Sequence, residues 1–126
     1  MKLKEVIDTI FEEEQGFLGS IDGYRLSVEG KEGAIPHIHC IKGNPKKPES
    51  VSCISLTKRG YANYSVWQTE LPKKVFEKVC EFLSSDKWLK AVNDWNESNS
   101  FKIQDGFVNP YNNKMIYKKS LNYNSK

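Results

Sequence analysis

The sequence predicts an α+β domain in which a small antiparallel sheet is followed by two helices. Short runs of alternating apolar and polar residues between positions 24 and 67 indicate strands. Apolar residues at three- and four-residue spacing then predict helices at about 72–84 and 86–97. The same spacing over residues 3–11 predicts an N-terminal helix. We therefore expect a three- to four-stranded sheet, with the two later helices packed on one face and the N-terminal helix at the edge or on the same face.

The strands are expected between turn-forming residues. Tyr24, Leu26 and Val28 alternate with polar residues and should face the core. Gly30 and Gly33 predict a turn after this first strand, and the proline- and glycine-containing stretch 43–48 predicts an exposed loop. The predicted strands are residues 24–29, 35–42, 51–57 and 61–67.

The two later helices carry their own signals. Pro72 suits the first turn of a helix, because a proline there has no N–H group to leave unpaired. Cys80 falls on the apolar face of that helix, which favours packing over reactivity. Trp88 and Trp95 are seven residues apart on one face of the next helix, so they are predicted to be core anchors.

Length and composition limit the class of protein. A chain of 126 residues suits one domain, and we assign residues 1–100 to it and residues 101–126 to a basic, aromatic-containing C-terminal extension. There is no apolar run long enough for a membrane helix, and acidic residues near the start argue against a signal peptide. Three cysteines without a CxxC pair favour reduced thiols. These features predict a cytoplasmic protein with no membrane partner.

The two histidines, His37 and His39, carry the main chemical signal. On a strand, residues two apart share one face of the sheet. If Ile38 and Cys40 face the core, both imidazoles lie on the opposite face, together with polar residues of the neighbouring strands. The predicted binding residues on this face are His37, His39, Arg25, Cys53 and Ser55.

Several interpretations of this face remain open from the sequence. It can be a polar sheet face whose histidines are hydrogen-bonded for structural reasons. It can be a metal site formed by His37, His39 and Cys53, with zinc as the ion, although a nearby Arg25 would repel a dication. It can use a histidine as a general acid or base, or bind an anion with Arg25. The sequence has no phosphate-binding glycine loop, GxSxG motif or HExxH motif that would select among these.

The C-terminal extension offers a separate candidate surface. It carries five lysines against one aspartate between residues 100 and 126. Interleaved basic and aromatic side chains can follow a phosphate backbone and stack on bases. The extension can equally be an ordinary solvated terminus, or can dock on the acidic run Glu12–Glu14. The predicted nucleic-acid-binding residues are Lys114, Tyr117, Lys118 and Lys119.

Three stretches of the chain occur in an order that is typical of one protein family. They are Ile35-Pro36-His37-Ile38-His39-Cys40, Leu71-Pro72-Lys73-Lys74-Val75 and Asn93-Asp94-Trp95-Asn96. Residues 36–95 thereby resemble a small prokaryotic family of unknown function with a Pro-His-x-His strand, a Leu-Pro helix and a final Asn-Trp helix. In most members a second proline stands where this chain has Ile35. The resemblance implies a compact domain, often encoded near toxin–antitoxin-like or mobile-element genes, and implies no reaction.

These observations give three functional hypotheses. The first is a small non-enzymatic binding or regulatory protein of bacterial or mobile-element origin, acting on a protein partner. The second is a metal- or histidine-dependent enzyme or metal protein centred on His37 and His39. The third is nucleic-acid binding through the C-terminal extension. No cofactor is expected apart from zinc under the second hypothesis.

Overall fold

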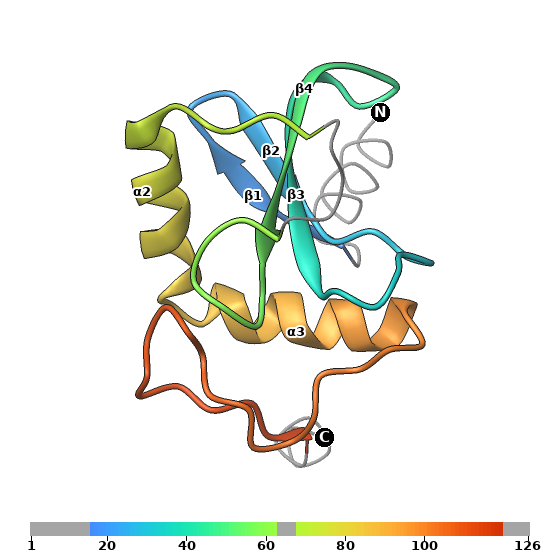
Figure 1. The fold of residues 1–126 in the computed structure, drawn as a ribbon, viewed down its shortest axis with the longest axis vertical. Helices are drawn as coiled ribbons and strands as arrows, with labels where there is room; N and C mark the ends of the chain where they lie inside the picture. The colour runs from blue at the N-terminus through green and yellow to red at the C-terminus, as the bar shows by residue number, and fades with distance from the viewer. Residues whose placement is uncertain (1–15, 63–67, 120–126) are drawn as a thin grey trace, which may run out of the picture.

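The chain folds as an α+β domain in a computed structural model that describes residues 16–62 and 68–119 (Figure 1). Four strands form one antiparallel sheet in the order β1-β2-β3-β4, and two helices follow it. This confirms an α+β domain with a four-stranded antiparallel sheet followed by two helices. The predicted N-terminal helix and most of the predicted strand 61–67 lie outside the described residues. The elements are β1 (Phe17–Ile21), β2 (Tyr24–Ser27), β3 (His37–Asn44), β4 (Lys47–Ser55), α2 (Lys73–Leu83) and α3 (Lys87–Ser98).

Strand β1 was not predicted, because its pattern is interrupted. Gly19 has a φ of 151°, and the register with β2 shifts between Phe17 and Gly19. Such a bulge breaks the two-residue alternation that identifies a strand in a sequence. Asp22 and Gly23, both with positive φ, form the tight turn into β2, as expected for an Asp-Gly hairpin.

Strands β3 and β4 continue through the stretch that was predicted to be a loop. Gly43 pairs with Pro48 and Asn44 pairs with Lys47, which leaves only two residues in the turn. The Asn44 side-chain oxygen accepts a hydrogen bond from the Lys46 N–H at 2.8 Å, which stabilises that turn. Proline is tolerated at position 48 because β4 is an edge strand of this sheet.

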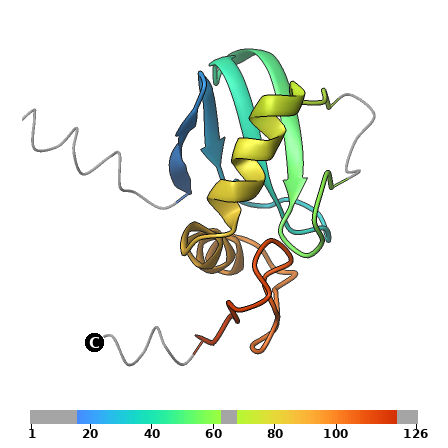
Figure 2. The same ribbon diagram turned by 90° about the vertical axis from the view of Figure 1, so that its left-hand side faces the viewer.

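The helices enclose the core from one face and one end of the sheet, so the prediction that both pack on one face is wrong for α3. Figure 2 shows α2 in front of the sheet, and Figure 1 shows α3 crossing below its lower end. The alternating residues predicted for the core are buried, as are both helix tryptophans. The Trp88 indole N–H donates to the Leu56 carbonyl at 3.0 Å, and this bond ties α3 to the end of β4.

Part of the predicted C-terminal extension belongs to the same core. Ile103, Tyr111 and Tyr117 are buried in the cluster formed by the sheet and helices. The Tyr111 hydroxyl donates to the Ser55 carbonyl at 2.7 Å, and the Asn109 amide donates to the Leu83 carbonyl at 2.9 Å. Residues 101–119 thus form a segment packed below α3 (Figure 1).

Candidate metal centre

The sheet brings most of the predicted site residues to one face. His39 pairs with Ser27 of β2 on one side and with Cys53 of β4 on the other, and His37 pairs with Ser55. Paired residues have side chains on the same face of a sheet. The predicted juxtaposition of the two histidines with Cys53 is therefore present in the fold.

Arg25 does not join this group. It pairs with Ile41, and its guanidinium lies 4.3 Å from the centre of the Phe17 ring. A pairing of Leu26 with Ile38 would set Arg25 opposite His39, but Leu26 pairs with Cys40. A shift of two residues keeps every side chain on its predicted face but moves Arg25 along the strand, away from the histidines. Arg25 is therefore not placed to repel a dication bound at the histidines, contrary to the prediction.

Ser55 lies on the predicted face but is engaged in a turn. Its hydroxyl oxygen accepts hydrogen bonds from the backbone N–H groups of Thr57 and Lys58, both at 3.1 Å. Side chains of this kind commonly order a turn in this way. Ser55 thereby shapes the exit from β4.

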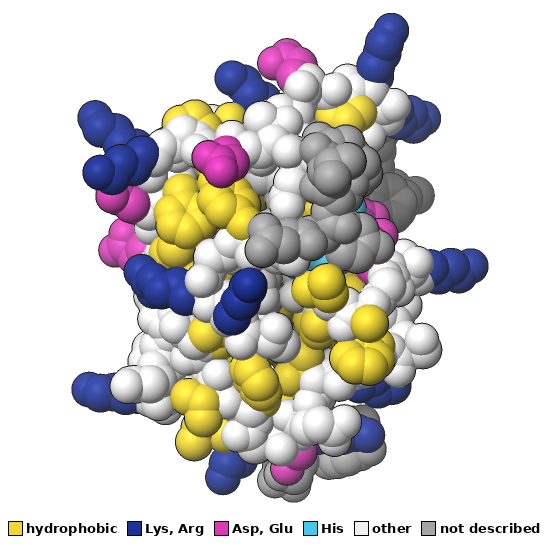
Figure 3. Space-filling view, viewed as in Figure 1, with side chains coloured by type: hydrophobic (Ala, Val, Ile, Leu, Met, Phe, Trp, Pro, Cys, Tyr) yellow, Lys and Arg dark blue, Asp and Glu magenta, His cyan; other side chains and the backbone are white. Residues whose placement is uncertain are grey.

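His37 is held in one orientation by its surroundings. Its ring is fully buried, and Nδ1 lies 2.6 Å from the Ile35 carbonyl oxygen. Because a carbonyl oxygen only accepts, Nδ1 carries the proton, and in the neutral ring Nε2 keeps its lone pair. That Nε2 atom lies 3.2 Å from Nε2 of His39, with the two rings stacked, and the Trp95 ring also contacts His37. Small areas of histidine side chain are visible on the face drawn in Figure 3.

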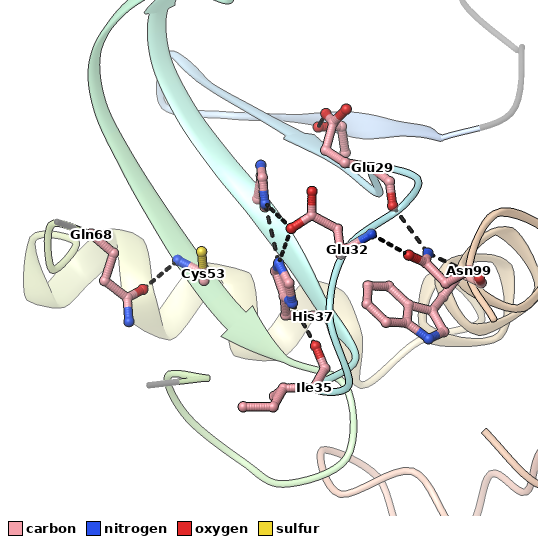
Figure 4. A network of polar contacts seen from close by, with 10 residues as sticks. Glu29, Glu32, Ile35, His37, Cys53, Gln68 and Asn99 are labelled. Atoms are coloured by element: carbon pink, nitrogen blue, oxygen red, sulfur yellow. Dashed lines mark hydrogen bonds and ion pairs between the residues drawn. The ribbon is translucent and has the colours of Figure 1, made fainter. Parts of the chain in front are cut away.

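A carboxylate that the sequence analysis did not identify reaches the same point. Glu32 lies in the loop between β2 and β3, and its Oε1 atom is 3.3 Å from His37 Nε2 and 3.7 Å from His39 Nε2. Figure 4 shows this carboxylate directed at His37 from that loop. A loop residue has no periodic pattern, so the sequence contains no signal for the direction of its side chain.

Cys53 completes a possible donor set with the two histidines. Its Sγ atom and one ring nitrogen from each histidine all lie within 4.8 Å of one another. Cys53 is fully buried, and its backbone N–H donates to the Gln68 side-chain oxygen at 2.7 Å. These three side chains are close enough together to share a metal ion.

Burial keeps two of these groups uncharged. It raises the pKa of the Cys53 thiol to about 11, and the negative charge of Glu32 acts in the same direction. Burial also lowers the pKa of His39, helped by the neighbouring His37 and opposed by Glu32. At neutral pH the free protein therefore holds a neutral thiol and a neutral His39 imidazole at this point.

The predicted nucleic-acid surface is divided by the fold. The Tyr117 ring is buried, and its hydroxyl accepts a hydrogen bond from the Asn96 amide at 3.3 Å, so the ring is not presented for stacking on a base. Lys114, Lys118 and Lys119 are exposed. Only the basic part of the predicted aromatic and basic combination is on the surface.

Comparison with known proteins adds no relative. A scan against protein-family models, a search of curated proteins and a search of solved structures each gave no significant match. Within residues 16–62 and 68–119, no helix has the length and apolar character needed to cross a membrane.

Proposed function

We propose that this chain is a small metal-binding protein of the non-enzymatic binding or regulatory class. Its ion is a zinc-like dication held by Nε2 of His37, Nε2 of His39 and Sγ of Cys53. The observation that carries this proposal is the 3.2 Å separation of the two imidazole nitrogens. Zinc–nitrogen bonds of about 2.0–2.1 Å in a tetrahedron place two ligand nitrogens roughly 3.3–3.4 Å apart.

The surroundings of His37 support a ligand role. Metal-binding histidines usually donate their second ring N–H to a carbonyl or carboxylate, which fixes the ring and exposes the other nitrogen. His37 has this arrangement, with Nδ1 on the Ile35 carbonyl and Nε2 directed at His39. The ring would need no reorientation to bind an ion at the shared point.

The sulfur of Cys53 decides the type of ion. Thiolate and imidazole ligands favour zinc and related transition metals, whereas magnesium and calcium require oxygen ligands. The tetrahedral nitrogen–sulfur separation for zinc is roughly 3.5 Å, from bonds of about 2.05 and 2.3 Å. Because Cys53 Sγ lies within 4.8 Å of one ring nitrogen of each histidine, a movement of roughly 1 Å or a little more brings the sulfur into bonding range.

A titration of the metal-free, untagged protein with zinc tests the proposal. We expect one zinc ion per chain, and His39→Asn and Cys53→Ser should each weaken binding at least about tenfold. Cys80→Ala is the matched control, because Cys80 lies on α2 outside this group and its loss should leave zinc affinity unchanged. A wild-type protein that binds no zinc, or site variants that bind as tightly as the wild type, would contradict the proposal.

A further inference from the structure

We infer that Glu32 is the fourth metal ligand, which makes the site a closed set of two imidazoles, one thiolate and one carboxylate. This inference rests on the proposed function and extends it to a residue of the loop between β2 and β3. The Oε1 atom of Glu32 lies 3.3 and 3.7 Å from the two histidine nitrogens. The tetrahedral nitrogen–oxygen separation around zinc is also roughly 3.3–3.5 Å.

The three atoms lie close enough together to share one cation. Nε2 of His37 lies 3.2 Å from Nε2 of His39 and 3.3 Å from Oε1 of Glu32. The same Glu32 oxygen lies 3.7 Å from Nε2 of His39. Two imidazole nitrogens and a carboxylate oxygen are ligands that zinc accepts, and these separations are close to those of a tetrahedral site.

The loop that carries Glu32 is already fixed in place by α3. The Glu32 backbone N–H donates to the Asn99 side-chain oxygen at 2.7 Å, and the Asn99 amide donates to the Glu29 carbonyl at 3.1 Å. The Lys31 N–H also donates to the Ser98 carbonyl at 3.2 Å. Figure 4 shows Asn99 beside this loop. The carboxylate therefore reaches the histidines with little ordering cost on binding.

Charge balance agrees with a four-ligand site. A buried dication requires compensating negative charge, because an unpaired charge in a protein interior is costly. The Cys53 thiolate and the Glu32 carboxylate together supply two negative charges, and the histidines remain neutral. Four protein ligands also leave no position for a reactive water, which is typical of structural zinc sites and differs from catalytic ones. The expected role is therefore to tie the loop at Glu32 to strands β3 and β4.

The variant Glu32→Gln tests this assignment, because it keeps the size of the side chain and the backbone bond to Asn99. We expect its zinc affinity, measured by competition with a chelator, to fall at least about tenfold. The optical spectrum of the Co²⁺-loaded variant should differ from that of the wild type, since one ligand has changed. Glu29→Gln is the matched control: it removes the same charge from the same loop, and its carboxylate accepts from the Ser27 hydroxyl at 2.9 Å. We expect the control to change affinity less than about threefold.

The outcomes separate this inference from the proposed function. A wild type that binds one zinc, with Glu32→Gln equally tight, overturns the role of Glu32 and leaves the three-ligand site standing. Equal weakening by both variants also overturns it, because the effect would then be one of general charge. A wild type that binds no zinc overturns both.

A second measurement needs no variant. Hydrogen exchange on the wild type should show that zinc slows exchange of the amides at 30–34, since the ion would restrain this loop. Exchange that zinc leaves unchanged at these positions counts against Glu32 as a ligand, even if Glu32→Gln fails to fold.

Discussion

Zinc binding is expected to release a proton from Cys53. The free thiol is protonated at neutral pH because burial raises its pKa to about 11, whereas a metal binds the thiolate. His39 is neutral already, because its pKa is lowered by burial. The proton displaced from Cys53 therefore sets the sign of the pH dependence: zinc affinity rises with pH.

The magnitude follows from the pKa of Cys53. Deprotonating a thiol of pKa about 11 at pH 7 costs roughly 5 kcal/mol, at about 1.4 kcal/mol per pH unit. Zinc must supply this free energy on binding at pH 7. The cost of deprotonating Cys53 falls by about 1.4 kcal/mol for each unit by which the pH rises. The dissociation constant for zinc should therefore decrease about tenfold between pH 7 and pH 8.

Calorimetric titrations in buffers of different ionisation enthalpy measure the protons released. The wild type should release about one proton more than Cys53→Ser, which has no thiol to deprotonate. The Cys53→Ser variant should also lose most of the dependence of affinity on pH between 7 and 8. Equal proton release by the two proteins would show that Cys53 does not bind zinc as a thiolate.

Three further predictions concern the fold and the C-terminal segment. Tyr111→Phe removes the hydroxyl that donates to the Ser55 carbonyl, and should lower the free energy of unfolding by about 1–2 kcal/mol in urea denaturation; an unchanged midpoint contradicts this. Gly16→Ala should cost about 2 kcal/mol or more in the same assay, because the new Cβ atom would lie 2.8 Å from the Val28 carbonyl oxygen at a φ of +98°; a loss below about 0.5 kcal/mol argues against this geometry. Replacing the three exposed lysines of the predicted nucleic-acid surface by glutamine should leave the anisotropy of a labelled single-stranded DNA unchanged relative to wild type, and a loss of salt-sensitive binding would favour the nucleic-acid hypothesis instead. Those lysines are Lys114, Lys118 and Lys119.

The regular parts of the fold were predictable because their periodicity is strong. The two helices and the core faces of β2, β3 and β4 follow directly from apolar spacing. Strand β1 was missed because the bulge at Gly19 interrupts its alternation. The hairpin through Pro48 was missed because proline disfavours a strand in general and is accepted here only at a sheet edge.

The candidate site was predictable in its sheet residues and not in its loop residue. Alternation alone places His37, His39 and Cys53 on one face, and this holds under any two-residue change of register. A two-residue change in the register between β2 and β3 does decide whether Arg25 lies beside the histidines. Nothing in the sequence determines that register. Glu32 depends on contacts between its loop and Asn99, 67 positions away, which no local pattern contains.

Anomalous diffraction from a zinc-loaded crystal at the zinc absorption edge is the most direct test of the metal centre. We expect one peak, about 2.0–2.1 Å from Nε2 of both His37 and His39 and about 2.3 Å from Sγ of Cys53. A zinc peak elsewhere in the molecule, with these three side chains unchanged and unligated, would contradict it.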